Sequence, residues 1–304
     1  MQASCSHLRH AVQRINPHRG AEAYMIKVSD YSLNYSRQIS DGKLTIFQFL
    51  KQCRKYDLEA ASMHIRNLPS VSTKYLKDLR RAYLDNGLSM SMFTVSTNFG
   101  NPRDGEKAEL EKAYQAIDVG MFLGAPILRV FAGSPKNEAD REDAFQRAVK
   151  GLRKTCEEAA EQGMTVGLQN HNHGALARTG EEMLRFIREV NHPNFTVLLD
   201  TGQFAGSGGA SGEVPPELKG ADFMESIRMT APLARHVRVK FYNPRADGSE
   251  PYIDYPKVFD ILRGVHYGGI IDIVYEPNRH GGDPIDKAMP RIVKYLKSLV
   301  QCAT

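Results

Sequence analysis

The stretch Val166-Gly-Leu-Gln-Asn-His-Asn-His-Gly174 is an apolar run that stops abruptly at polar side chains capable of chemistry. A second run, Leu199-Asp-Thr-Gly-Gln203, ends in the same way further along the chain. Two similar endings follow, at His236-Val-Arg-Val-Lys240 and at Ile273-Val-Tyr-Glu276. When parallel strands form a barrel, their carboxyl ends meet at one face, and catalytic side chains gather there. The four endings therefore predict an enzyme with one shared site.

Apolar strands alternate with amphipathic helices along most of the chain. One expected helix aligns Leu110, Tyr114 and Ile117 on a single face and stops at Gly124, as glycine commonly does just past a helix end. Strands are expected near residues 25, 60, 90, 128, 166, 197, 238 and 272. Eight strand–helix repeats predict an α/β fold, a single-domain (β/α)8 TIM barrel. This catalytic domain is expected over residues 23–304, after a loose, polar N-terminal extension over residues 1–22.

The composition is that of an ordinary globular protein, with 304 residues, 41% hydrophobic, 25% charged and a net charge of +5. Four scattered cysteines without a CxxC pair predict reduced thiols and a cytoplasmic location. No apolar run has the length of a membrane span. The sequence contains no glycine-rich phosphate-binding loop, so it predicts no nucleotide cofactor. It also contains no stripe rich in basic and aromatic residues, so it predicts no nucleic-acid binding. A homo-oligomer is compatible with a barrel of this kind.

Alternation along the strands predicts which side chains share a direction. Gln169, His171 and His173 point the same way while their strand lasts. The same rule places His236, Arg238 and Lys240 together on their strand. The carboxylates Asp200 and Glu276 each end an apolar run and are expected at the rim of the barrel.

These residue types allow more than one chemistry. Carboxylates with histidines form a plausible site for Mn, Mg, Zn or Co. In a metal-free site, Lys240 and Arg238 would polarise a carbonyl while Glu276 removes the adjacent proton. A purely structural interpretation is that the same charges form ion pairs that cap the barrel.

Four motifs in this order and spacing carry a family resemblance: Leu-Gln-Asn-His at 168–171, Leu-Asp-Thr-Gly-Gln at 199–203, His-Val-Arg-Val-Lys at 236–240 and Val-Tyr-Glu at 274–276. Together they resemble the xylose-isomerase-like TIM-barrel superfamily. This is a group of sugar isomerases and epimerases (sugar phosphate isomerase/epimerase family) related to inosose dehydratase and endonuclease IV. The resemblance covers roughly residues 24–300.

The resemblance implies one divalent metal, Mn, Co, Mg or Zn, held by two glutamates, an aspartate and a histidine. Asp200 and Glu276 match that pattern by position. Gln169 stands where the first glutamate is expected, Arg238 where the histidine belongs, and Gln203 in place of a histidine common after the Asp-Thr-Gly turn. A His-x-His motif similar to one in inosose dehydratase offers replacement ligands. The implied metal ligands are Asp200, Glu276, Gln169 and His171.

The departures from the family pattern change the expected chemistry. A glutamine cannot take up a proton near neutral pH, and an arginine does not normally bind metal. Arg238 is therefore a candidate to occupy the metal's electrostatic place. Glu276 is the one family base clearly retained, so a second acid–base group would have to be His171, with a pKa near the working pH.

The sequence thus predicts a sugar or keto-sugar isomerase or epimerase that abstracts a proton next to a carbonyl, assisted by a metal. The alternatives are a dehydratase or lyase that eliminates from a keto-sugar or keto-polyol, and a non-catalytic carbohydrate-binding barrel that has lost its metal. The predicted catalytic residues are Glu276, His171, Lys240 and Arg238. The predicted substrate-binding residues are His173, Gln203, Arg129 and His236.

Overall fold

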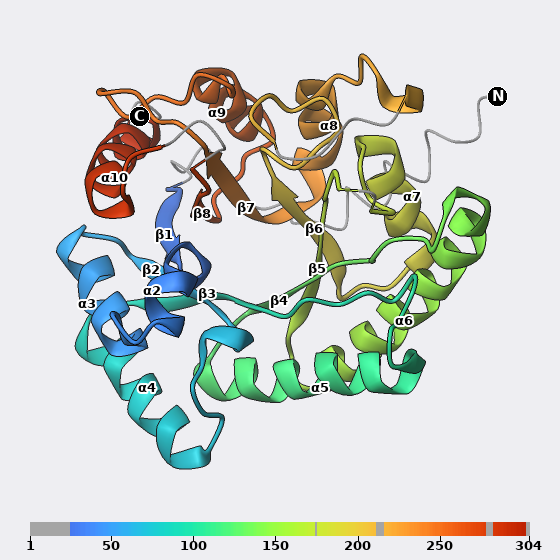
Figure 1. Ribbon diagram of the computed structural model, residues 1–304, viewed down its shortest axis with the longest axis horizontal. Coiled ribbons are helices and arrows are strands. Elements are labelled where there is room, and N and C mark those ends of the chain that lie inside the picture. Colours follow the sequence, from blue (N-terminus) through green and yellow to red (C-terminus); the bar gives the residue numbers. More distant parts are fainter. Residues whose placement is uncertain (1–24, 174, 211–215, 278–281, 302–304) are drawn as a thin grey trace.

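The eight predicted strands close into one parallel barrel in the computed structural model, in the order β1 to β8 with β8 beside β1 (Figure 1). Helices surround the barrel, so the prediction of a (β/α)8 TIM barrel is confirmed. The structure describes residues 25–173, 175–210, 216–277 and 282–301. The predicted extension over residues 1–22 lies outside this part of the chain.

The strands and helices follow one another in regular alternation. The strands are β1 Lys27–Tyr31, β2 Ala60–His64, β3 Ser89–Thr94, β4 Ile127–Val130, β5 Thr165–Gln169, β6 Phe195–Asp200, β7 Ala234–Phe241 and β8 Ile270–Tyr275. The helices are α2 Ser36–Ser40, α3 Ile46–Lys55, α4 Thr73–Asp85, α5 Gly105–Leu123, α6 Arg141–Glu161, α7 Gly180–Val190, α8 Phe223–Thr230, α9 Tyr255–Gly264 and α10 Ile285–Gln301.

Local signals define several helix ends. Helix α3 begins at a capping box, in which Thr45 accepts a hydrogen bond from the backbone of Gln48 and the Gln48 side chain accepts one in return. Helix α7 begins at Thr179, whose side chain caps the backbone of Glu182. Helix α5 ends at Gly124, as predicted, with φ of 85°. These caps set where the three helices begin or end.

Strand β7 shows how the barrel separates its two faces. Val237 and Val239 belong to the large apolar core that includes residues of the surrounding helices. The alternate residues His236, Arg238 and Lys240 are also buried, at 1 to 2% exposure, but on the opposite face of the strand. The interior of this barrel is therefore polar on β7, and polar groups buried there must find partners.

Among the helices that the structure describes, none has both the length and the hydropathy needed to cross a membrane.

A carboxylate on β1, Asp30, is fully buried between the barrel and its helices. It accepts hydrogen bonds from the backbone N of Tyr31 at 2.8 Å, from Nδ2 of Asn34 at 2.7 Å and from the hydroxyl of Tyr35 at 2.9 Å. Burial outweighs these hydrogen bonds and raises the pKa of Asp30 to about 7.

The Asp30→Asn variant is expected to lose part of the pH dependence of stability. Unfolded aspartate releases its proton near pH 4, whereas the pKa of folded Asp30 is about 7. The folded state binds more protons in this window, so the free energy of unfolding falls as the pH rises through it, by up to about 4 kcal/mol. The free energy of unfolding, measured with urea at several pH values across this window, should depend less steeply on pH in Asp30→Asn than in wild type. Equal dependence on pH in the two proteins would contradict the raised pKa of Asp30.

Candidate active site

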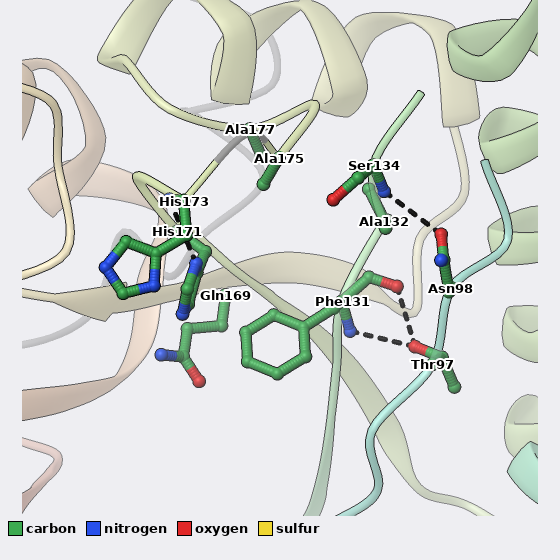
Figure 2. A pocket seen from close by; sticks show the side chains of 11 residues that line it. Thr97, Asn98, Phe131, Ala132, Ser134, Gln169, His171, His173, Ala175 and Ala177 are labelled. Atoms are coloured by element: carbon green, nitrogen blue, oxygen red, sulfur yellow. Dashed lines mark hydrogen bonds between the residues drawn. The ribbon is translucent and has the colours of Figure 1, made fainter. Parts of the chain in front are cut away.

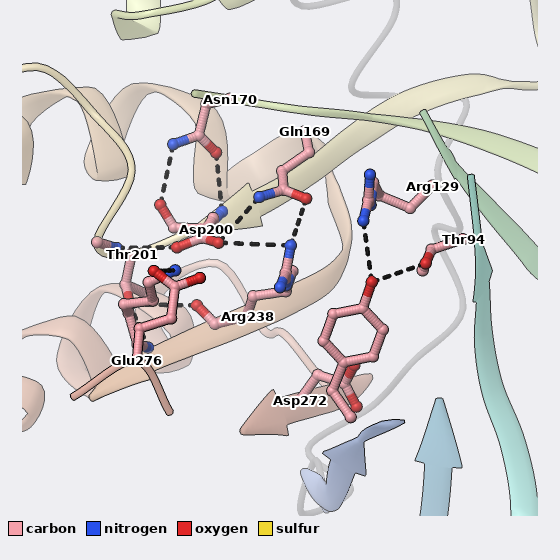
Figure 3. A network of polar contacts seen from close by, with 12 residues as sticks. Thr94, Arg129, Gln169, Asn170, Asp200, Thr201, Arg238, Asp272 and Glu276 are labelled. Carbon is pink, nitrogen blue, oxygen red and sulfur yellow. Dashed lines mark hydrogen bonds and ion pairs between the residues drawn. The ribbon is translucent and has the colours of Figure 1, made fainter. Parts of the chain in front are cut away.

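Polar side chains from β5 to β8 meet at the carboxyl ends of the strands, where the sequence predicted a shared site (Figure 3). Strand pairing sets Asp200 opposite Arg238. The two strand ends beyond them carry Lys240 and Glu276, and the backbone N of Glu276 donates to the carbonyl oxygen of Phe241. The arrangement follows from barrel register, because neighbouring parallel strands present their last residues side by side.

A buried trio made of Arg238, Gln169 and Asp200 fills the centre of this site. The guanidinium of Arg238 lies 3.6 Å from Oδ2 of Asp200 and donates a hydrogen bond to Oε1 of Gln169. The amide nitrogen of Gln169 donates to the same Oδ2 of Asp200 at 2.9 Å. All three residues are no more than 2% exposed. The glutamine amide thus has its oxygen turned to the cation and its nitrogen turned to the carboxylate.

Aromatic and backbone contacts hold the trio in place. The guanidinium carbon of Arg238 lies 4.8 Å from the centre of the Tyr31 ring. The backbone N of Gly202 donates to Oδ1 of Asp200 at 3.1 Å. The trio is therefore held in its arrangement by neighbouring residues of the protein.

The side chain of Asn170 joins the ends of β5 and β6. Its Nδ2 donates to the carbonyl oxygen of Asp200 at 2.9 Å, and its Oδ1 accepts from the backbone N of Asp200 at 2.8 Å. The next backbone N, that of His171, turns away and donates to the carbonyl oxygen of Ala177 at 2.8 Å. The chain after β5 thus leaves the sheet while β6 stays paired.

Lys240 and Glu276 form the ion pair at the rim, with 2.8 Å between Nζ and Oε2. The lysine side chain is 2% exposed, whereas that of Glu276 is 47% exposed. Burial by itself would raise the pKa of Glu276, but Lys240 and then Arg238 outweigh it and hold that pKa below its ordinary value. Glu276 is therefore an ionised carboxylate that can be reached by a ligand.

A glycine makes the room that Lys240 occupies. A Cβ atom on Gly202 would lie 2.5 Å from Cγ of Lys240 and 2.8 Å from the hydroxyl of Tyr242. That hydroxyl donates to the carbonyl oxygen of Gly202 at 2.7 Å. The Asp-Thr-Gly turn thus positions the lysine as well as the carboxylate.

His171 is a neutral imidazole in this site. Its Nδ1 accepts a hydrogen bond from the backbone N of His173 at 3.2 Å, so the ring proton resides on Nε2. Burial, the His173 ring and Lys240 lower the pKa of His171 to about 3. The expectation of a pKa near the working pH is therefore not met. The reason is desolvation beside a cation, which disfavours the imidazolium.

We expect the imidazole of His171 to stay neutral from neutral pH down to about pH 4, because its pKa is lowered to about 3. Histidine ring signals followed by NMR over this range should include at least two that do not titrate, those of His171 and of His64, whose pKa burial lowers to about 2. The one that is missing from the spectrum of the His171→Gln variant belongs to His171. A midpoint near 6.5 for His171 would contradict the structure.

A pocket of about 200 Å³ opens beside His171 (Figure 2). It lies over the carboxyl ends of β3, β4 and β5. Its lining is Thr97, Asn98, Phe131, Ala132, Gly133, Ser134, Gln169, His171, His173, Ala175 and Ala177. Gln169 of the buried trio and His171 therefore both border the pocket.

The four predicted substrate-binding residues lie in different places. His173 lines the pocket. Gln203 is 3% exposed and follows the Asp-Thr-Gly turn. Arg129 is 1% exposed and donates to the carbonyl oxygen of Val95 and to the Tyr31 hydroxyl, at 3.1 and 2.9 Å. These contacts make Arg129 a buried support of the site.

His236 lies deeper in the barrel than the rim. It precedes Arg238 by two residues on β7, and its Nε2 is 3.7 Å from Oδ2 of Asp272. The same carboxylate accepts a hydrogen bond from the hydroxyl of Ser62. The structure thus places His236 in an interior polar layer beneath the trio rather than at the site opening.

Residues on the first four strands complete the site and were missed from the sequence. Tyr31 ends β1 and lies against Arg238. His64 ends β2, with its Nε2 3.2 Å from the hydroxyl of Ser96. Asn98 and Phe131 line the pocket after β3 and β4. The signal was present, because β1, β2 and β3 end at Tyr31, His64 and Thr94, and Phe131 directly follows β4.

The predicted metal ligands do not form one donor set. Gln169 and Asp200 contact each other, Glu276 pairs with Lys240, and Nδ1 of His171 is already an acceptor. Across the described ranges, no group of three or more His, Cys, Asp or Glu side chains could hold a metal ion. Arg238 lies 3.6 Å from Oδ2 of Asp200, and a guanidinium does not ligate cations. The residues present therefore do not fit the implied metal.

Comparisons with known proteins agree with the fold. Residues 50–299 match the family model described as "Xylose isomerase-like TIM barrel". Two relatives are each 25% identical and are 3-dehydroshikimate dehydratases, from Pseudomonas putida over 126 residues and from Bacillus anthracis over 195 residues. These alignments cover 41% and 64% of this chain. They span only 19% and 65% of the two relatives.

Solved structures with the same fold include several sugar epimerases. A D-psicose 3-epimerase superposes with a TM-score of 0.72 at 16% identity, covering 90% of this chain and 98% of that one. The D-psicose 3-epimerase of Clostridium cellulolyticum H10 gives 0.68 at 18% identity, with 91% and 96% covered. The 3-keto-D-glucoside 4-epimerase of E. coli gives 0.67 at 14% identity, with 91% and 100% covered.

Proposed function

Because the chain belongs to the xylose isomerase-like TIM-barrel family, we propose that it is an enzyme that isomerises a keto-sugar or a related keto-polyol. The reaction begins with removal of a proton from the carbon next to the carbonyl. The observation that carries this proposal is the Lys240–Glu276 pair, a buried ammonium joined to a reachable carboxylate at the barrel rim.

Glu276 is the proposed base. Its Oε2 accepts from Lys240, which leaves Oε1 to take the substrate proton. When Lys240 turns to donate to the substrate carbonyl, Glu276 loses part of the interaction that lowers its pKa and becomes a stronger base. The ammonium then stabilises the enolate oxygen that proton removal creates. His171 is the proposed partner that donates a hydrogen bond from Nε2.

The positive charge in this mechanism comes from the chain itself. Arg238 pairs with Asp200 and Lys240 pairs with Glu276 at this end of the barrel, while Arg129 is buried on β4. The ammonium of Lys240 can therefore turn to a substrate oxyanion while Arg238 stays beside Asp200. We propose that Arg238 takes the electrostatic place of the divalent metal that the family resemblance implies.

Among the described residues of the site, Glu276 is the open carboxylate, and one such base favours isomerisation over two-base epimerisation. An epimerase of the two-base kind needs an acid–base group on each face of the substrate carbon. Gln169 cannot serve as the second, because an amide does not take up a proton near neutral pH, and the low pKa of His171 makes it a weak base. One base is sufficient to move a proton between neighbouring carbons.

Dehydration is the second candidate function. Both sequence relatives are 3-dehydroshikimate dehydratases. β-Elimination from a keto compound starts with the same proton removal by Glu276, and then expels a hydroxyl group instead of returning the proton. The same residues therefore support both reactions.

A carbohydrate-binding barrel without activity is the third candidate. A cytoplasmic location and a homo-oligomer stay predictions.

Proton exchange in heavy water tests the proposal. Protein treated with a chelator is incubated with D-fructose, D-tagatose or 3-dehydroshikimate, and the products are followed by NMR and mass spectrometry. Deuterium next to the carbonyl together with an aldose product supports isomerisation, an epimeric ketose would support epimerisation instead, and loss of water supports dehydration. Absence of both reactions supports the binding barrel. Activity that the chelator abolishes and Mn or Co restores would overturn the assigned role of Arg238.

A further inference from the structure

The pocket beside His171 has an end remote from the reacting groups. That end is formed by the loops after β3 and β4 and carries Thr97, Asn98 and Ser134 (Figure 2). Among the described residues that line the pocket there is no lysine, arginine, aspartate or glutamate. A bound group there would meet neutral donors and acceptors and the half-buried ring of Phe131.

The amide of Asn98 has a fixed orientation at this end. Its Oδ1 accepts hydrogen bonds from the backbone N of Ser134 at 3.0 Å and of Asn101 at 3.2 Å. Two donors on the oxygen leave the nitrogen at the other end of the amide, since only an oxygen can accept both. Within the part of the chain that the structure describes, Nδ2 of Asn98 has no hydrogen-bond partner.

The surrounding backbone is built for this orientation. Gly133 has φ of 95°, and a Cβ atom there would lie 2.0 Å from Oδ1 of Asn98. The backbone N of Asn98 donates to Oε1 of the buried Glu109 at 2.7 Å. Only a glycine at 133 allows this close approach, so Asn98 is held from three directions.

The neighbouring threonine cannot play the same part. The hydroxyl of Thr97 donates to the carbonyl oxygen of Phe131 at 2.6 Å and accepts from the backbone N of Phe131 at 2.9 Å. The Thr97 hydroxyl thus joins the loops after β3 and β4, and its one hydrogen is already donated to Phe131. Asn98 therefore offers a ligand an oriented donor at this end of the pocket, beside the rotatable hydroxyl of Ser134.

We propose that Asn98 marks a substrate subsite for an uncharged, hydroxyl-bearing part of the substrate, the part remote from the carbonyl. The inference rests on the proposed function and adds the substrate class, an unphosphorylated sugar or polyol. A hydroxyl oxygen accepts from Nδ2 without needing a counter-charge. A phosphate at this end would be desolvated without a cation among the lining residues, which is costly.

The Asn98→Asp variant tests the subsite. The carboxylate still accepts from Ser134 and Asn101, so the loops keep their contacts, but the donor becomes a negatively charged acceptor. We expect KM for an exchanging ketose to rise by roughly tenfold or more, with a much smaller change in kcat, because the lost contact is remote from the reacting carbon. Asn101→Asp is the matched control, because it adds the same charge on an exposed neighbour.

A ligand that cannot react separates this inference from the proposed function. Mannitol has the hydroxyl groups of a sugar but no carbonyl, and its binding is followed by saturation-transfer NMR with wild type and both variants. Binding that Asn98→Asp abolishes and Asn101→Asp preserves supports the subsite, even when no ketose reacts. Equal binding and equal KM for wild type and Asn98→Asp would overturn it. Tighter binding of fructose 6-phosphate than of fructose would also overturn it.

Discussion

The Glu276→Gln variant is expected to lose deuterium exchange by about a hundredfold to ten-thousandfold, the range over which a general base contributes. The amide has the shape of the carboxylate and keeps an oxygen for Lys240, so the rim should retain its structure. It cannot take up the substrate proton. Exchange is measured by NMR with the ketose that wild type labels fastest.

Two controls make this result specific to the rim. Glu111→Gln changes the same group on an exposed carboxylate of α5, whose side chain is 63% exposed, and should leave exchange unchanged. Mannitol binding should persist in Glu276→Gln, because the polyol has no carbonyl proton to lose. Undiminished exchange in Glu276→Gln would remove this residue as the base and transfer the role to another group.

The second large effect is expected on stability, in the Arg238→Met variant. Removing the guanidinium leaves Asp200, which is 0% exposed, without its cation. Deleting one partner of a buried ion pair typically costs about 3–5 kcal/mol of unfolding free energy, because the other charge stays buried. Arg228→Met is the control, since Arg228 pairs with Glu225 on the surface, where such pairs are worth about 1 kcal/mol or less.

A double-mutant cycle separates the ion pair from simple loss of packing. Asp200→Asn alone leaves Arg238 facing a neutral amide, and it too should destabilise the fold. In the double variant neither charge is left buried, so the cost should fall below the sum of the single costs by more than about 1 kcal/mol. Purely additive costs, measured by urea unfolding, would show that the charges do not stabilise each other.

The barrel and its polar strand ends could be predicted because they depend on local pattern. Eight apolar runs separated by amphipathic segments specify the fold. Gln169 and Asp200 could be placed at the carboxyl ends of the strands because they end β5 and β6, and Glu276 because it directly follows β8. Even the unusual Arg238 was recognisable from its position in the motif, and the contact with Asp200 that it makes follows from strand register.

Partners across the barrel could not be predicted, because they depend on packing between distant strands. Arg129 looked like an anion-binding residue at the rim, yet it is 1% exposed and donates to the Tyr31 hydroxyl and to the carbonyl oxygen of Val95. His236 shares its strand face with Lys240, but it lies four residues earlier on β7 and therefore deeper in the barrel, beside Asp272. The pKa of His171 depends on burial and on a lysine that is far away in sequence. The sequence pattern contains none of these distances.

Asn170 has a consequence for how the site can open. At the end of β6, the backbone N and O of Asp200 are protected by the Asn170 side chain rather than by a further residue of strand β5. The chain that follows β5 is held by other bonds, from the backbone N of His171 to the carbonyl oxygen of Ala177 and from the backbone N of Leu176 to that of Gly133. Opening these bonds would leave the Asn170 bonds to Asp200 intact, so we expect amide hydrogen exchange to be faster at His171 and Leu176 than at Asp200.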